Sequence, residues 1–221
     1  MGLRVASPMF RVSDLNVSIG PVPIIRSATF ALEEGDFCGL IGRNGSGKTT
    51  LFRAIMGAIP ACGIAKLGRV DLLKLPPHLR VAHGIGYMPE DRRLVPEFTV
   101  EENVRLPALS LKMRDADRRL DWIFGLMPEV AQFRGRSSLE LSGGQQKMVA
   151  LARALMAGRR MLLLDEPFEG LAPALARRLG EVLANLKSEG ISILVAESNE
   201  VHVVDLLSRA FRIERGAVRP A

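Results

Sequence analysis

Residues 42–50 read GRNGSGKTT, and this stretch decides the fold that the sequence predicts. It matches the pattern G-x-x-x-x-G-K-[ST], in which glycines let the backbone wrap closely round phosphate oxygens. The apolar run FCGLIG at residues 37–42 precedes it, as expected for a strand buried on both faces. The segment KTTLFRAIMGAI at residues 48–59 follows, with its apolar residues on one helical face. Strand, glycine-rich loop and helix in this order are the context in which the pattern binds phosphate.

This loop supplies backbone N–H groups and side chains that suit a polyphosphate. Lys48 would bring positive charge to the outer phosphates, and the Thr49 hydroxyl would ligate Mg²⁺. The alternative is a glycine-rich turn with a chance lysine, which the flanking strand and helix disfavour. The predicted phosphate-contacting residues are Gly42, Arg43, Asn44, Gly45, Ser46, Gly47, Lys48, Thr49 and Thr50.

Two adjacent carboxylates end the apolar run MLLLDEP at residues 161–167. Asp165 and Glu166 are costly at a buried strand end unless they meet a cation or polarise a water molecule. Asp165 would hold Mg²⁺ through its waters, and Glu166 would orient or deprotonate an attacking water. An ordinary solvated strand end is the alternative, and the nearby phosphate loop makes it the weaker one.

The segment LSGGQQ at residues 141–146 predicts a second helix start that suits an anion. Ser142 is a favourable N-cap, the glycines leave backbone N–H groups accessible, and QQKMVALARALMAG continues as a helix. Taken alone, a simple capped helix is the better interpretation. Two helix starts that suit phosphate in one chain suggest instead that two chains share each nucleotide.

The remaining elements alternate between strands and helices, which predicts a parallel sheet covered on both faces. A capping-box spacing at Thr99 and Glu102 predicts a helix start, and a second helix is predicted across residues 115–127. We expect an α/β fold formed by one unit, residues 1–221, in which about 1–93 and 139–221 form the core and about 94–138 form an inserted helical subdomain. The other predicted elements are two antiparallel strands within 10–32 at a sheet edge, a helix over 174–187, a strand over 191–196, a helix around 201–208 and a last strand over 210–215.

Composition limits the kinds of binding partner that the chain is expected to have. The formal net charge of +6 suits phosphates, nucleic acid or an anionic membrane face, and a merely basic surface is an equal alternative. Because the chain has one Trp and one Tyr, few platforms are available for stacking bases, so nucleic acid is a minor hypothesis. No stretch approaches the roughly 18 apolar residues of a membrane span, and we expect a cytoplasmic chain.

In order and spacing, GRNGSGKTT, LSGGQQ and LLLDEP resemble the Walker A, signature and Walker B motifs of ABC-type ATPases, and the resemblance covers nearly the whole chain. It implies a P-loop NTPase core with an N-terminal antiparallel β-subdomain, and hydrolysis of ATP with Mg²⁺. It also implies a head-to-tail pair of chains that sandwiches ATP between the phosphate loop of one and the signature of the other. Ser142, Gly143, Gly144 and Gln145 would then contact the γ-phosphate of the partner chain's ATP.

Two segments are similar to ATP-binding subunits of branched-chain amino acid importers, namely residues 84–104, GIGYMPEDRRLVPEFTVEENV, and residues 165–173, DEPFEGLAP. Glu90 stands where most ABC ATPases carry a glutamine, and its carboxylate would still suit Mg²⁺ or its waters. By this resemblance, residues 91–102 would touch a transmembrane permease. The implied partners are permease subunits, a second ABC ATPase chain in a homodimer or heterodimer, and a solute-binding protein upstream. The implied location is peripheral, on the cytoplasmic face of the inner (plasma) membrane.

Two positions depart from the family pattern. Ile19 occupies the place where an aromatic residue usually stacks on adenine, which would weaken that contact by about 1 kcal/mol. Ser198, in ILVAESNEV at residues 193–201, occupies the place of the switch histidine and has a shorter reach and no cationic form. His202 lies one helical turn onward, and we expect it to be a surface residue.

Three alternatives stay open at this stage. A P-loop kinase or GTPase is disfavoured because such enzymes do not need LSGGQQ. A non-transport ABC protein acting on nucleic acid or ribosomes is a stronger rival, although such proteins usually carry a coiled-coil insertion or two linked ATPase units. A weakly active regulatory subunit would account for Ser198 and Glu90.

Overall fold

The computed structural model describes residues 8–221. Its largest sheet is a central one of six strands. Its strand order is β10-β9-β3-β8-β7-β6, and every neighbouring pair is parallel except β9 and β10. Strands β3, β7 and β8 are buried along their whole length, as their apolar runs predict. The six strands are β3 (Phe37–Ile41), β6 (Ile85–Met88), β7 (Met161–Asp165), β8 (Ser192–Glu197), β9 (Arg209–Glu214) and β10 (Ala217–Pro220).

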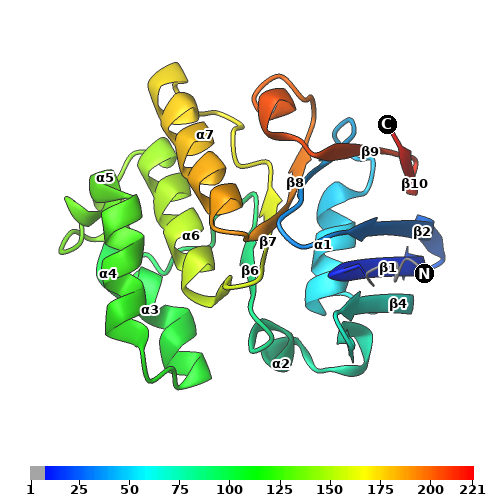
Figure 1. Cartoon of the computed structure of the whole chain (residues 1–221), viewed down its shortest axis with the longest axis horizontal. Helices are drawn as coiled ribbons and strands as arrows, with labels where there is room; N and C mark the ends of the chain where they lie inside the picture. Colours follow the sequence, from blue (N-terminus) through cyan, green and yellow to red (C-terminus); the bar gives the residue numbers. More distant parts are fainter. Residues whose placement is uncertain (1–7) are drawn as a thin grey trace, which may run out of the picture.

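Helices and a second sheet cover the two faces of this central sheet (Figure 1). Helices α6 (Gly143–Ala157) and α7 (Pro173–Ser188) cover one face, and α3 (Val100–Leu111), α4 (Ala116–Leu126) and α5 (Pro128–Ala131) pack outside them. Helix α1 (Lys48–Met56) covers the other face, between the central sheet and an antiparallel sheet of order β2-β1-β4-β5. The remaining elements are β1 (Phe10–Ile19), β2 (Val22–Leu32), β4 (Cys62–Leu67), β5 (Val70–Asp71), α2 (Pro77–Val81) and 3₁₀ turns at Leu72–Lys74, Ser138–Glu140 and Val204–Leu206.

The predicted α/β fold with an antiparallel sheet is confirmed, and so are both capping interactions. Thr99 and Ser142 cap α3 and α6, and in each case the N3 side chain, Glu102 or Gln145, accepts a hydrogen bond from the cap's N–H. The division into a core and a helical subdomain stays a prediction, although α3, α4 and α5 all fall within residues 94–138. Of the helices within residues 8–221, none is long and apolar enough to cross a membrane.

The predicted helix around residues 201–208 is wrong. Only a 3₁₀ turn forms at Val204–Leu206; Val201 and Val204 are exposed, and Val203 is the fully buried residue of this segment. Three β-branched residues within four positions also disfavour helix.

One strand prediction also needs correction. The strand over residues 210–215 is not the last, since β9 continues through Arg215 and Gly216, both at positive φ, into the antiparallel strand β10. Such two-residue turns match the twist of a hairpin. Strands β1 and β2 pair antiparallel as predicted, and β2 forms an edge of the separate antiparallel sheet that also holds β4 and β5.

Candidate functional site

Four neighbouring strands bring the predicted site residues together at one edge of the central sheet. Strands β3, β8, β7 and β6 are adjacent and parallel, so the segments that follow them leave the sheet on the same side. These segments begin at Gly42, Ser198, Glu166 and Pro89. A cavity of about 400 Å³ lies among them, lined by Ile24, Asn44, Gly45, Gly47, Lys48, Thr49, Thr50, Glu90 and Glu166.

The phosphate-binding loop depends on glycine at positions where no larger residue fits. A Cβ atom on Gly42 would lie 2.3 Å from the carbonyl oxygen of Ile213, and Gly47 adopts φ +112° directly before α1. No side chain caps α1, and its first turn holds no acidic residue. The first N–H groups of the helix are therefore left for an anion, as the sequence pattern predicts.

Lys48 is buried and held at the mouth of this loop. Its Nζ donates to the carbonyl oxygens of Gly42, at 2.5 Å, and Arg43, at 3.2 Å, and lies 2.9 Å from Glu166 Oε1. Both partners of the ion pair are almost fully buried, so neither charge is screened by solvent. The pair places a cation and a carboxylate side by side in the wall of the cavity.

Asp165, the last residue of β7, is fully buried and has oxygen groups on either side. Thr49 Oγ1 donates to its Oδ1 at 3.2 Å, and the Tyr87 hydroxyl donates to its Oδ2 at 3.5 Å. Burial raises the pKa of Asp165 to about 6, in spite of the Thr49 hydrogen bond. The desolvated carboxylate would therefore gain from a nearby cation.

The donor set at this point fits Mg²⁺. The hydroxyl of Thr49 and the carboxylate of Asp165 are hard oxygen ligands, and Glu90 lines the same cavity. Within residues 8–221 no cluster of three or more His, Cys, Asp and Glu side chains could hold a metal by itself.

Glu166 is held in an uncommon backbone conformation beside Ser198. Its φ is +49°, in the left-handed region that non-glycine residues seldom adopt, and its N–H donates to the carbonyl oxygen of Ala196. The Ser198 hydroxyl lies 2.6 Å from Asn44 Oδ1 and 3.1 Å from Glu166 Oε1. A hydroxyl has one proton, so Ser198 donates to one of these oxygens at a time. Ser198 thus links the phosphate-binding loop to Glu166.

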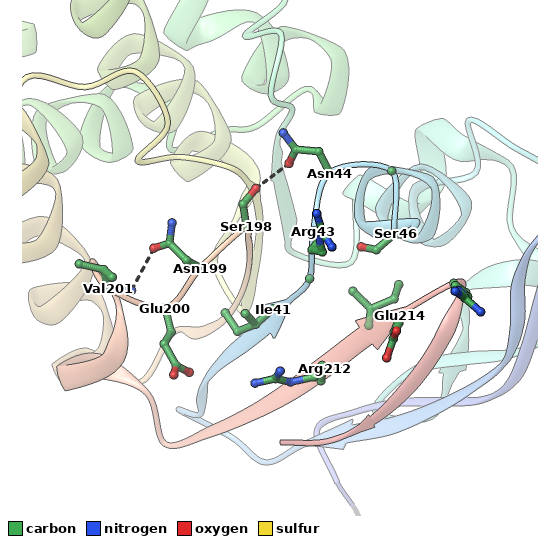
Figure 2. A pocket seen from close by; sticks show the side chains of 14 residues that line it. Ile41, Arg43, Asn44, Ser46, Ser198, Asn199, Glu200, Val201, Arg212 and Glu214 are labelled. Carbon is green, nitrogen blue, oxygen red and sulfur yellow. Dashed lines mark hydrogen bonds between the residues drawn. The ribbon is translucent and has the colours of Figure 1, made fainter.

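A second cavity of about 800 Å³ lies next to the first, and Asn44 and Gly45 line both. Figure 2 shows Ser198 and Asn44 joined by their hydrogen bond, with Arg43 and Ser46 on the same loop and Arg212 and Glu214 along β9. The Ser46 hydroxyl oxygen is the buried side-chain atom of residues 8–221 that lacks a hydrogen-bond partner. An orphan hydroxyl in this loop is consistent with a loop that holds an oxygen-rich ligand.

Three sets of predicted site residues line neither cavity, namely the fully buried Asp165, the signature residues and Ile19. Ser142, Gly143, Gly144 and Gln145 line neither cavity, and instead the guanidinium of Arg92 donates to the Gly143 carbonyl at 3.3 Å. Ile19 lines neither cavity and is 54% exposed at the end of β1. The hairpin residue that does line the smaller cavity is Ile24, which sequence reasoning missed.

Sequence reasoning also missed Tyr87 and Lys147. Glu197 ends a fully buried strand, as Asp165 does, and begins the polar run at residues 197–200 that the sequence places at this strand end. His202 is exposed as expected, and its ring stacks on that of Phe168 with centroids 5.3 Å apart.

Comparisons with known proteins agree with this geometry. Residues 25–169 match the family model described as "ABC transporter". Over 211 residues, 95% of this chain and 91% of the other, the chain is 30% identical to the high-affinity branched-chain amino acid transport ATP-binding protein BraG of Pseudomonas aeruginosa. It is 31% identical to the lipopolysaccharide export system ATP-binding protein LptB of Escherichia coli, covering 87% of this chain and 81% of LptB.

A solved structure supports the same likeness. The chain superposes on a nucleotide-free ATP-binding cassette from an ABC transporter with a TM-score of 0.83 and 26% identity, covering 96% of this chain and 90% of the other.

The raised pKa of Asp165 predicts how Asp165→Asn changes stability with pH. Below about pH 4 both the folded and the unfolded chain carry a protonated Asp165; as pH rises towards 6, the unfolded chain loses this proton first, so folding stability falls. Removing the carboxylate should therefore raise the free energy of unfolding at pH 8 by about 1–3 kcal/mol and change it little at pH 4. Each kcal/mol shifts the midpoint of thermal unfolding by about 2–4 °C, so thermal unfolding in EDTA without nucleotide would resolve the difference.

Asp121→Asn, which removes an exposed carboxylate from α4, controls for the change in net charge. Glu197, whose pKa burial raises to about 7, would leave part of the pH dependence in place in both variants. An Asp165→Asn protein with equal gains at pH 4 and pH 8 would contradict the assigned effect of burial.

Proposed function

Because the chain belongs to the ABC transporter family and is an ATP-binding ATPase, we propose that it powers an importer of branched-chain amino acids or a related small organic solute. The observation that carries the proposal is the length of the likeness to BraG, which spans 95% of this chain. The segments 84–104 and 165–173, on either side of the cavity, carry the same resemblance in sequence. The proposal rests on these two regions together with the geometry of the site.

In the proposed reaction, ATP binds with its phosphates on the loop of residues 42–50. The Lys48 ammonium neutralises the outer phosphates from a position 2.9 Å from Glu166. Thr49 and Asp165 would hold Mg²⁺, which screens the phosphate charge when bound. Glu166 orients and deprotonates the attacking water, and Ser198 keeps the Glu166 carboxylate in place through its hydroxyl.

The signature residues support a head-to-tail dimer. Ser142, Gly143, Gly144 and Gln145 line neither cavity of their own chain, although their helix start suits an anion. A second chain, identical or paralogous, would bring these residues to the γ-phosphate bound by the first. ATP binding would then close the dimer and hydrolysis would release it.

The segment of residues 91–102 is our candidate for contact with the permease. Arg92 and Arg93 both have positive φ, and Arg153 of α6 donates to both of their carbonyl oxygens. Phe98 in this segment and Leu139 nearby, 36% and 69% exposed, give it an apolar surface.

A solute-binding protein would act upstream, and the chain would lie at the cytoplasmic face of the inner membrane. Adenine would lie near Ile19 and Ile24.

A second candidate function is an exporter subunit, which the 31% identity to LptB favours. A non-transport ABC protein that acts on nucleic acid or ribosomes finds less support, because the chain matches transporter subunits over most of its length. A weakly active regulatory subunit would account for Ser198 and Glu90, and the hydrolysis rate distinguishes it.

Lys48→Ala should weaken nucleotide binding, whereas Glu166→Gln should weaken only hydrolysis. Loss of the buried ammonium should weaken ATP binding at least about tenfold, whereas Glu166→Gln should keep binding and lower kcat by about 10²–10⁴-fold because the general base is gone. Light scattering with ATP should show a stable dimer for Glu166→Gln and a monomer for Lys48→Ala. Thermal unfolding of both variants verifies that they fold. Hydrolysis by Glu166→Gln at the unmutated rate would refute the role of Glu166.

Ser198→His should raise ATP turnover severalfold in the complex with the permease. An imidazole reaches further than a hydroxyl and donates to phosphate in both its neutral and cationic forms. Ser198→Ala is the matched control, since it removes the contact with Glu166 without adding reach, and it should lower turnover. If turnover is the same in all three proteins, Ser198 is merely tolerated at this position.

Uptake of labelled leucine tests the transport function itself. Deleting the gene in the source organism should abolish high-affinity uptake, and the unmutated chain should restore it while Glu166→Gln does not. The Glu166→Gln strain controls for a scaffolding role, because that variant is expected to assemble normally. Unchanged leucine uptake together with defective export of an envelope lipid would favour the exporter candidate instead.

A further inference from the structure

The backbone that aims Glu166 is strained and has to be held in place. Glu166 follows the last residue of β7 with φ +49°. A non-glycine residue in this region is strained and persists only where the surrounding structure fixes it. The loop of residues 166–169 therefore depends on contacts from other elements.

Lys147 supplies two of these contacts from α6. Its side chain is buried, and its Nζ donates to the carbonyl oxygens of Glu166, at 2.7 Å, and Glu169, at 2.5 Å. Burial lowers the pKa of Lys147, while the nearby carboxylates Glu169, Glu197 and Glu166 oppose this effect and favour the charged form. Lysine is rarely buried unless its ammonium has partners, and here those partners are backbone carbonyls of the loop that follows β7.

Glu197 holds the same loop from the sheet. Its buried carboxylate accepts a hydrogen bond from the Phe168 N–H at 3.1 Å. Strand β8 therefore holds the N–H groups of Glu166 and Phe168, and Lys147 holds the carbonyl groups of Glu166 and Glu169. Two of these four backbone points belong to Lys147.

Lys147 lies on the first turns of the helix that Ser142 caps, four residues after Gly143. We propose that Lys147 is a positioning residue for hydrolysis, which joins the backbone that aims Glu166 to the start of the signature helix. The proposal deepens the proposed function, because it rests on Glu166 as the group that activates water. In a closed dimer, the position of the signature helix would then set the position of the carboxylate in the same chain. Lys147 itself touches no substrate.

The test compares Lys147→Met with a matched lysine that serves the fold alone. Lys187 of α7 also donates from Nζ to a backbone carbonyl, that of Leu206 at 2.8 Å, outside both cavities. Lys147→Met should lower kcat at least tenfold and change KM for ATP less than threefold, because misplacement by about 1 Å costs up to 10²-fold. Lys187→Met should leave kcat unchanged while lowering thermal stability. Lys147→Arg should restore most of kcat, since a guanidinium also donates to two carbonyls.

A result in which Lys147→Met and Lys187→Met lower kcat equally would overturn the proposal and leave Lys147 a structural residue. If Lys147→Met does not fold, Lys147→Arg and Lys147→Gln decide the test instead. The proposal then requires that kcat be lower in Lys147→Gln than in Lys147→Arg. The double variant Lys147→Met/Glu166→Gln should still form the ATP-bound dimer, because neither change removes the phosphate loop or the signature. Loss of that dimer would assign Lys147 to dimer formation and refute the positioning role.

The same assays separate this proposal from the proposed function. If Glu166→Gln hydrolyses ATP at the unmutated rate, the role of Glu166 fails whatever Lys147 does. If Glu166→Gln is inactive and Lys147→Met retains full kcat, the proposed function stands and only the positioning role is refuted.

Discussion

Parallel pairing of β3, β8, β7 and β6 is the constraint on which the site depends. Each of these strands ends at the same edge of the sheet, so the segments after β3, β7 and β6 line the smaller cavity and the segment after β8 lines the larger cavity next to it. Ser198 and Asn44 are 154 positions apart in the chain, yet they form a hydrogen bond because β8 lies directly beside β3. Register matters as much as order, since the pairing of Ile41 with Glu197 and of Asp165 with Ala196 sets which side chains emerge together.

Buried charged groups at this edge of the sheet explain the raised pKa values in the site. Burial raises the pKa of Asp165 to about 6 and that of Glu197 to about 7, because the strands that deliver them are covered on both faces. The positive charge of Lys48 offsets part of this cost by lowering both pKa values. The fold is therefore less stable near neutral pH than a sheet with apolar strand ends would be, and a bound cation and phosphate would change that balance.

Local patterns predicted the parts of the site that depend on neighbouring residues in sequence. The phosphate loop, the acidic pair after β7 and the two capping boxes all lie within a few residues, so their spacing predicts their geometry. The local sequence does not indicate that Lys147 belongs to the site, because a lysine in an amphipathic helix is ordinarily solvated. The partners of Lys147 come from a loop distant in sequence. The segment of residues 201–208 failed for a related reason. Its apolar residues predicted a helix, but only the tertiary structure reveals that Val201 and Val204 stay exposed.

Helix α6 connects the separate parts of the site through basic side chains that bind backbone carbonyls. Lys147 holds the loop after β7, and Arg153 holds the segment after Glu90 at Arg92 and Arg93. Carbonyl acceptors fix the course of the backbone itself, so a shift of the helix displaces both loops, whatever their side chains. Both cationic side chains are shielded from solvent, so their bonds resist screening by salt. Helix α6 therefore links, through these hydrogen bonds, the segment proposed to contact the permease and the loop that carries Glu166, the carboxylate proposed to activate water.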